Sequence, residues 1–243
     1  MKILLTIAYD GTKYFGWQRQ NDFTTVQGEV EKALSKLFNS KVVVIGASRT
    51  DTGVHAIGQR ATFEMQTTIP LANLPYAINN ALPKDIRVHK AEEVGFDFHP
   101  QYAAKNKTYR YRIYNASFQN PILNNYTWHI PKELDIEKMK EGASYILGEH
   151  NFSAFCASGA TSKTRVREVY SLEIYKEDNM IYFDINGNGF LYNMVRIIAG
   201  TLVYVGTGKF SASDVSKIIE SLDRTKAGKT APPEGLILMH INY

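Results

Sequence analysis

The stretch "TTVQGEVEKALSKLFNSKVVVIG", residues 24–46, changes its hydrophobic period part-way along its length. Five large apolar residues of its first part recur at helical spacing: Val26, Val30, Leu34, Leu37 and Phe38. That spacing predicts an amphipathic helix over 25–38, and Thr24 followed by Gln27 has the capping-box pattern of a helix start. The apolar run after the helix predicts a strand over 41–46.

The neighbouring segments extend this into a regular order of elements. Residues 2–9 predict a strand, and further strands are expected over 57–65 and 86–94. Between these two strands, four leucine and isoleucine residues mark a second helix: Leu71, Leu74, Ile78 and Leu82. The order strand, helix, strand, strand, helix, strand predicts a ferredoxin-like unit, an antiparallel sheet with helices on one face.

The second half of the chain repeats this mixture less regularly. Strands are expected over 107–114, 165–176, 180–186 and 236–242, the middle two forming a hairpin. Helices are expected from Asp135 to Leu147, over 190–205, and from Ser211 to Leu222. The fold class is therefore expected to be α+β. Two halves, 1–104 and 105–243, should share one continuous sheet or pack closely.

Composition excludes several classes of protein. The chain has 243 residues, 44% of them hydrophobic, so it is long enough to bury a core without metals or disulfides. Its single cysteine, Cys156, forms no internal disulfide, which fits the reducing cytoplasm. No metal-ligand spacing or phosphate-binding loop is present. The longest apolar stretch, 190–205, contains Asn193 and Arg196 and is too short and polar to span a membrane.

The net charge of +4 is distributed unevenly. Between Phe98 and Pro131 there are four basic residues and no acidic ones: Lys105, Lys107, Arg110 and Arg112. A second basic group follows: Lys163, Arg165 and Arg167. Such clusters attract phosphates, but a solvated basic face would have the same composition, and charge alone favours neither.

The loop "SRTDTGVHA", residues 48–56, follows the predicted strand 41–46. Its aspartate, Asp51, has two interpretations. It could accept hydrogen bonds from the amides of Thr52 and Gly53, as turn aspartates do, or the loop could present it to a substrate. From the loop alone the turn interpretation is preferred, because a functional carboxylate needs a reason to be buried and ionised.

Arg196 is the only charged residue of the apolar segment "GFLYNMVRIIAGTLVYVG", residues 189–206. A helix this apolar must be mostly buried, and a buried guanidinium needs an acceptor because it cannot lose its proton. Its acceptor could be Asp51, a backbone carbonyl, Asp184 or Glu168, and spacing does not decide among them.

The strand "KTYRYRIY", residues 107–114, alternates aromatic and basic side chains. Tyr109, Tyr111 and Ile113 should share one face and Arg110 and Arg112 the other. The aromatic face could belong to the core or form a stacking platform for a base beside phosphate-binding cations. His55 and Cys156 lack catalytic partners in the sequence and are expected to pack locally.

Five motifs together resemble the bacterial tRNA pseudouridine synthase A family. They are "YDGTKYFGWQRQ", "SRTDTGVHA", "KTYRYRIYN", "FLYNMVR" and "APPEGLILMHINY", and they extend over essentially the whole chain. The resemblance implies two ferredoxin-like halves around a long antiparallel sheet. It also implies a homodimer without metal or cofactor, acting on uridines 38, 39 and 40 in the anticodon stem-loop of tRNA.

The resemblance assigns roles to individual residues. It implies that Asp51 is the catalytic nucleophile, that Tyr109 stacks on the target base, and that Arg196 pairs with Asp51. Arg49 is expected to enter the space left by the flipped nucleotide. Lys105, Lys107 and Arg110 are candidate phosphate contacts.

Three alternatives compete with this interpretation, and one of them, a plain scaffold of the same fold, would leave Arg196 unexplained. A tRNA-binding protein without catalysis would keep the basic and aromatic strand but would have no use for a buried aspartate–arginine pair. A nucleoside or glycoside hydrolase usually needs two cooperating carboxylates, and the motif loops offer only Asp51. An isomerase needs no redox cofactor, because converting uridine to pseudouridine changes no atoms overall.

Overall fold

The structure, a computed structural model, describes residues 1–243 as two compact units. The first unit contains residues 1–105 together with 237–243, and the second contains 106–236. The expected division between residues 104 and 105 lies next to the point where the chain passes into the second unit. The C-terminal segment differs from expectation, because β10 (Leu236–Asn242) pairs with β3 (His55–Glu64) of the first unit.

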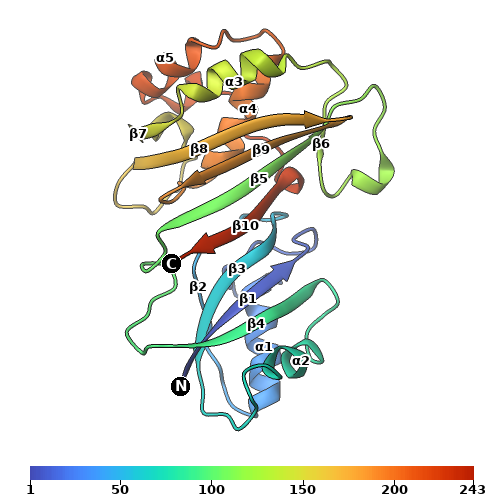
Figure 1. Ribbon diagram of the computed structural model, residues 1–243, viewed down its shortest axis with the longest axis vertical. Coiled ribbons are helices and arrows are strands. Elements are labelled where there is room, and N and C mark those ends of the chain that lie inside the picture. The colour runs from blue at the N-terminus through green and yellow to red at the C-terminus, as the bar shows by residue number, and fades with distance from the viewer. The chain divides into compact units, whose positions relative to one another are not determined.

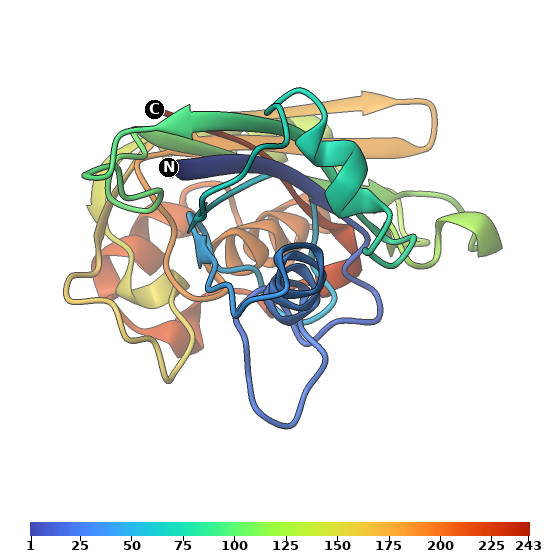
Figure 2. The same ribbon diagram turned by 90° about the horizontal axis from the view of Figure 1, so that it is seen from below.

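The first unit has the ferredoxin-like order that the sequence predicts. Its strands lie in the order β4 (Ile86–Val94), β1 (Lys2–Tyr9), β3 and β10, and β1 is antiparallel to both neighbours. The short β2 (Ile45–Gly46) pairs antiparallel with β3. Two helices accompany this sheet, α1 (Val26–Phe38) and α2 (Leu74–Asn79). Figure 2 shows α1 beneath the strands.

The second unit places an antiparallel sheet against three helices. Its strands lie in the order β5 (Asn106–Tyr114), β9 (Met180–Gly187), β8 (Val166–Glu177) and β7 (Gly148–Asn151). A short strand, β6 (Trp128–His129), runs parallel to β5. In Figure 1 the helices gather on one side of this sheet: α3 (Ile136–Ser144), α4 (Met194–Gly206) and α5 (Asp214–Ser221). Four short 3-10 helices lie in the connections: Pro121–Leu123, Ser153–Phe155, Arg224–Lys226 and Pro233–Gly235.

The expected α+β class is confirmed, with two parallel exceptions to the antiparallel pattern. The predicted strands and helices all occur, although several of their ends differ. The β10 and β3 strands are parallel, as are β5 and β6. The short strands β6 and β7 were not expected from the sequence. No helix has both the length and the apolar composition needed to cross a membrane.

Three expected boundaries are wrong, each for a local reason. The helix cap is Thr25 and not Thr24, since the Thr25 side chain accepts the amide hydrogen of Gly28. The helix expected over 190–205 starts only at Met194, because Asn193 has a left-handed backbone with φ of 61°. The strand expected over 41–46 is reduced to β2, because the backbone before β2 bonds to side chains of α1.

Candidate active site

Asp51 lies on the loop between β2 and β3, and its residue is half-buried. Just before it, the amide of Ala47 donates to the carbonyl of Arg60 on β3 at 2.8 Å. The next residue, Ser48, bonds to the fully buried Gln59 side chain, which accepts from its amide and donates to its carbonyl. The Gln59 amide thus extends the pairing of β2 with β3 by one residue toward Asp51.

Main-chain bonds close the turn that carries Asp51. The amide of Val54 donates to the carbonyl of Asp51 at 3.1 Å, and the amide of Gly53 donates to the carbonyl of Tyr14 at 3.2 Å. Gly53 has a positive φ of 78°, a conformation that glycine adopts without strain. The turn interpretation had the Asp51 carboxylate accepting from the amides of Thr52 and Gly53, and the Gly53 amide bonds to Tyr14 instead.

A second segment, residues 9–17, lies against the Asp51 loop. The amide of Trp17 donates to the carbonyl of Thr50 at 3.1 Å, and the hydroxyls of Tyr9 and Thr50 are 2.7 Å apart. A Cβ atom at Gly16 would overlap the carbonyl oxygen of Thr50, and one at Gly11 would overlap that of Val54. These two glycines therefore permit a close backbone approach that larger residues would prevent.

His55 and Arg49 flank Asp51 and have different environments. His55 is buried, and its Nδ1 accepts from the amide of Gly11 at 3.0 Å and lies 3.2 Å from a carboxylate oxygen of Asp10. The expectation that His55 packs and bonds locally is confirmed. Arg49 is exposed and makes no hydrogen bond or ion pair within the chain, so its guanidinium is available to an external anion.

Tyr109 lies on β5 in the second unit. Its residue is buried, and its ring meets Phe190 edge-on, with centroids 5.3 Å apart. The expected alternation along β5 is confirmed, since Tyr109, Tyr111 and Ile113 are buried and the residues between them are half-buried. The hydroxyl of Tyr111 donates to the carbonyl of Pro232, and burial raises its pKa well above the usual range.

The opposite face of β5 is more structured than a solvated basic face. The guanidinium of Arg110 forms a bidentate ion pair with Asp184 on β9, with N–O distances of 2.7 and 2.6 Å. The hydrogen bonds and charge of Asp184 raise the pKa of Arg110. Arg112 lies over the ring of Tyr126 at 5.9 Å from its centroid. A phosphate contact by Arg110 would therefore compete with its pairing to Asp184.

Arg196 occupies the first turn of α4, a helix whose other residues are almost all buried. Its Nε donates to the carbonyl of Ala231 at 2.7 Å, and its Nη1 donates to the side chain of Asn193 at 2.9 Å. One of the expected acceptor types, a backbone carbonyl, is thus present. Another named alternative, Asp184, is paired with Arg110 instead. The amide of Ala231 in turn donates to the carbonyl of Arg196.

The other candidate cations differ in burial. Lys105 is exposed, whereas Lys107 at the start of β5 is half-buried. Desolvation, with a smaller contribution from the charge of Arg167, lowers the pKa of Lys107 to about 8. Cys156 is buried, as expected, and Arg165 donates to its sulfur at 3.1 Å. No cluster of three or more potential metal ligands occurs in the chain.

Comparison with known proteins identifies the family. The family model described as tRNA pseudouridine synthase matches residues 5–103 and 143–243. The chain belongs to the tRNA pseudouridine synthase family. It is an enzyme that isomerises uridine to pseudouridine in tRNA, so the alternatives of a tRNA-binding protein without catalysis and of a hydrolase are not supported.

Individual relatives in the family match the chain over its full length. The "tRNA pseudouridine synthase A" of Ruminiclostridium cellulolyticum is 54% identical over 243 residues, covering 100% of this chain and 99% of that protein. The proteins of the same name from Thermoanaerobacter sp. and Bacillus licheniformis are 52% and 46% identical, covering 99% and 100% of this chain and 99% of each relative.

Among solved structures, a Cbf5-Nop10-Gar1 complex contains a chain with a TM-score of 0.40 and 13% identity, covering 83% of this chain and 45% of that one. This likeness is too low to carry an argument.

Within this pseudouridine synthase, the candidate residues fall into two sets. Asp51 and Arg49 share one loop of the first unit, while Tyr109, Lys107 and Arg196 lie in the second. Sequence reasoning missed the residues that hold the Asp51 loop: Tyr9, Gly16, Trp17 and Gln59. The glycine spacing in "DGTKYFGW" was a usable signal for a close approach, but nothing local indicated what the glycines would approach.

Proposed function

We propose that Asp51 is the nucleophile with which this enzyme isomerises uridines 38, 39 and 40 in the anticodon stem-loop of tRNA. The observation that carries the proposal is the construction of the Asp51 loop. Its turn is closed by main-chain bonds, and its flanks are held by Gln59 and by the 9–17 segment. These contacts set the position of the main chain that carries the carboxylate.

The chemistry of the reaction explains why one carboxylate is central. The N1–C1′ bond of uridine breaks, the uracil turns, and C5 joins C1′ with loss of the C5 proton and gain of one at N1. Attack at C1′, attack at C6 and removal of a sugar proton each need an ionised carboxylate. In the proposal, the guanidinium of Arg196 keeps Asp51 ionised by offsetting its desolvation.

The remaining assignments concern the tRNA. The target base must leave its stack at a cost of a few kcal/mol, and stacking on Tyr109 returns about 1–3 kcal/mol. Arg49, exposed and unpaired within the chain, enters the space that the nucleotide leaves. Lys105, Lys107 and Arg110 contact phosphates. The enzyme works without a cofactor, as a homodimer, in the cytoplasm, as the sequence resemblance implies.

The proposal is tested by tritium release from tRNA that carries 5-tritiated uridine. Wild-type enzyme should release tritium, whereas Asp51→Asn should bind tRNA with unchanged affinity and release none. Thr52→Ser is the matched control, because it alters the exposed neighbour and keeps the carboxylate. Turnover by Asp51→Asn well above background would contradict the nucleophile assignment.

The positions are tested with substrate variants. Replacing uridines 38–40 by cytidine in one tRNA should abolish tritium release, and replacing the same number of uridines outside the anticodon stem-loop should not. Undiminished release from the first substrate would show that the enzyme modifies other uridines.

A further inference from the structure

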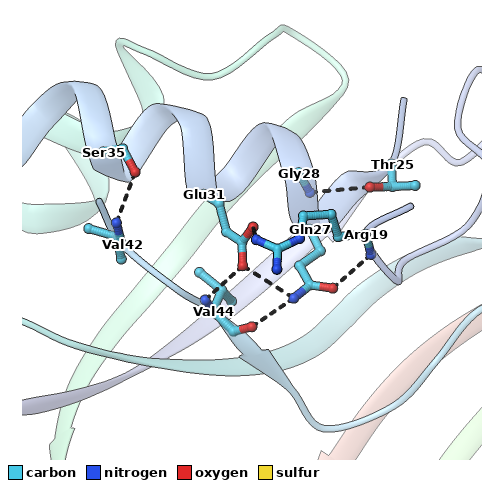
Figure 3. Close-up of polar contacts among 8 residues, drawn as sticks. All are labelled: Arg19, Thr25, Gln27, Gly28, Glu31, Ser35, Val42 and Val44. Atoms are coloured by element: carbon cyan, nitrogen blue, oxygen red, sulfur yellow. Dashed lines mark hydrogen bonds and ion pairs between the residues drawn. The ribbon is translucent and has the colours of Figure 1, made fainter. Parts of the chain in front are cut away.

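Residues 41–44, which precede β2, pair with no strand, and their backbone bonds to side chains of α1 instead. Val42 and Val44 are buried, but residues 41–44 form no strand, and β2 begins only at Ile45. Their backbone groups are paired in another way: the amide of Val42 donates to the Ser35 hydroxyl, and the amide of Val44 donates to a carboxylate oxygen of Glu31, each at 3.0 Å. Figure 3 shows these contacts on one face of the helix.

Gln27 completes this row of polar side chains. Its Nε2 donates to the carbonyl of Val44 at 2.8 Å and contacts Glu31 at 3.3 Å (Figure 3). Residues 27, 31 and 35 are four apart, so they share one face of α1. These three side chains bond to the backbone of residues 42–44, as a neighbouring strand would in a sheet. Immediately afterwards β2 pairs with β3, which continues the restraint to Ser48.

The same helix also holds the segment on the other side of the Asp51 loop. The first amides of α1, those of Val26 and Gln27, donate to the carbonyls of Gly16 and Trp17. The side-chain oxygen of Gln27 accepts the amide hydrogen of Arg19 at 2.8 Å. Gln27 thus bonds both to the segment that lies against Thr50 and to the segment that leads into the loop.

The charges in this network are matched within it. Glu31 is 6% exposed, and its second carboxylate oxygen accepts from Arg19 at 2.7 Å. A buried carboxylate is costly unless it is paired and bonded. An apolar residue here would stabilise the core without that cost, but it could not accept the amide hydrogen of Val44.

We propose that Gln27 and Glu31 are positioning residues that set the place of Asp51 through segments 16–19 and 42–48. The proposal rests on Asp51 being the nucleophile. The two residues do not contact the substrate in this scheme; they determine where the loop begins and what it rests on. A displacement of about 1 Å at a reacting group costs up to roughly 100-fold in rate, so loss of this network should appear in the chemical step.

Three substitutions at Glu31 separate the effect of side-chain length from the effect of charge. Glu31→Gln keeps the length needed to accept from Val44 and loses the charge, whereas Glu31→Asp keeps the charge and is one methylene shorter. If Glu31 acts through Val44, the single-turnover rate of tritium release should fall in the order wild type, Glu31→Gln, Glu31→Asp, Glu31→Ala. The last variant should lose roughly 10- to 100-fold with unchanged tRNA affinity. A rate for Glu31→Asp above that of Glu31→Gln would overturn the proposal.

Asn79 provides a matched control for stability. Its side chain donates to the carbonyl of Val88 and accepts from the amide of Val88, both at 2.8 Å, so it holds β4 much as Gln27 holds the 42–44 segment. Asn79→Ala and Gln27→Ala should cause similar losses in urea stability, but only Gln27→Ala should lower the rate. Glu29→Gln, on the same helix without contacts to 42–48, should leave the rate unchanged. Equal rate losses in Asn79→Ala and Gln27→Ala would reduce the network to a general stabilising role.

Two further measurements keep the test decisive. Amide hydrogen exchange at Val44, Ala47 and Ser48 should accelerate in Glu31→Asp, which reports on the segment even if Glu31→Ala fails to fold; unchanged exchange would contradict the proposal. Asp51→Asn is assayed beside these variants. Residual turnover by Asp51→Asn would refute the nucleophile assignment, whereas an inactive Asp51→Asn beside fully active Glu31 variants would refute the positioning role alone.

Discussion

The Asp51 loop and helix α4 hold their charged side chains by different means. The loop has no regular secondary structure, and it is held by hydrogen bonds and close backbone approaches from Gly16, Trp17 and Gln59. Arg196 instead belongs to a helix whose apolar side chains are almost all buried. Directional contacts thus hold the loop that carries Asp51, whereas packing holds the helix that carries Arg196.

Because of this difference, substitutions in the two regions should affect turnover and stability to different degrees. A hydrogen bond contributes about 0.5–1.5 kcal/mol net to stability but restricts direction as well as distance. Removing a large apolar side chain costs about 2–5 kcal/mol, yet packing tolerates changes of shape when volume is kept. Substitutions around the Asp51 loop should therefore lower turnover more than stability, and substitutions in α4 should do the reverse.

The largest expected loss of stability is in α4. Leu202 is fully buried and lies against α3 near Gly142, so Leu202→Ala should lower the free energy of unfolding by about 2–5 kcal/mol. Leu202→Met, which keeps the volume, should cost less than about 1.5 kcal/mol. Urea unfolding measures both. Single-turnover rates at low temperature should stay near wild type in each, and a large drop would show that α4 packing and catalysis are not separable.

A comparable loss of stability with a larger loss of turnover is expected at Gly16. Gly16 and Gly208 have nearly equal φ values of 77° and 76°, but only Gly16 has a backbone oxygen where a Cβ would be. Both alanine variants carry left-handed strain of about 1–2 kcal/mol. Overlap with Thr50 should add about 1–3 kcal/mol at Gly16 alone. Urea unfolding and tritium release test this, and equal effects of the two variants would show that the close approach is unimportant.

A further effect, which depends on pH, concerns a charge in the second unit. Desolvation lowers the folded-state pKa of Lys107 to about 8 from 10.5, so the protonated form is penalised in the folded state. The penalty is fully present below pH 8 and is relieved as pH rises toward 10.5, because the unfolded chain then binds more protons. Wild type should therefore gain stability relative to Lys107→Met between pH 8 and 10. A stability difference that is constant with pH would show that Lys107 is well solvated.

The sequence identified the candidate functional residues better than it identified the residues that hold them in place. The alternation along β5 and the apolar character of α4 follow from spacing, and both are confirmed. Most of the strand expected over 41–46 does not form, because propensity cannot show which partner a backbone segment finds. Val42 and Val44 alternate with exposed neighbours as in a strand, yet their hydrogen bonds go to Ser35 and Glu31.

The sequence by itself determined the α+β class, the buried faces and the family, because hydrophobic period and motif order are properties of local spacing. The tertiary structure alone decided that one helix supports both sides of the Asp51 loop. Glu31 and Gln27 look like ordinary polar residues of an amphipathic helix until the docking of α1 brings Val44 within hydrogen-bonding distance. A side chain's partner depends on where distant segments pack, and spacing along one helix carries no information about that.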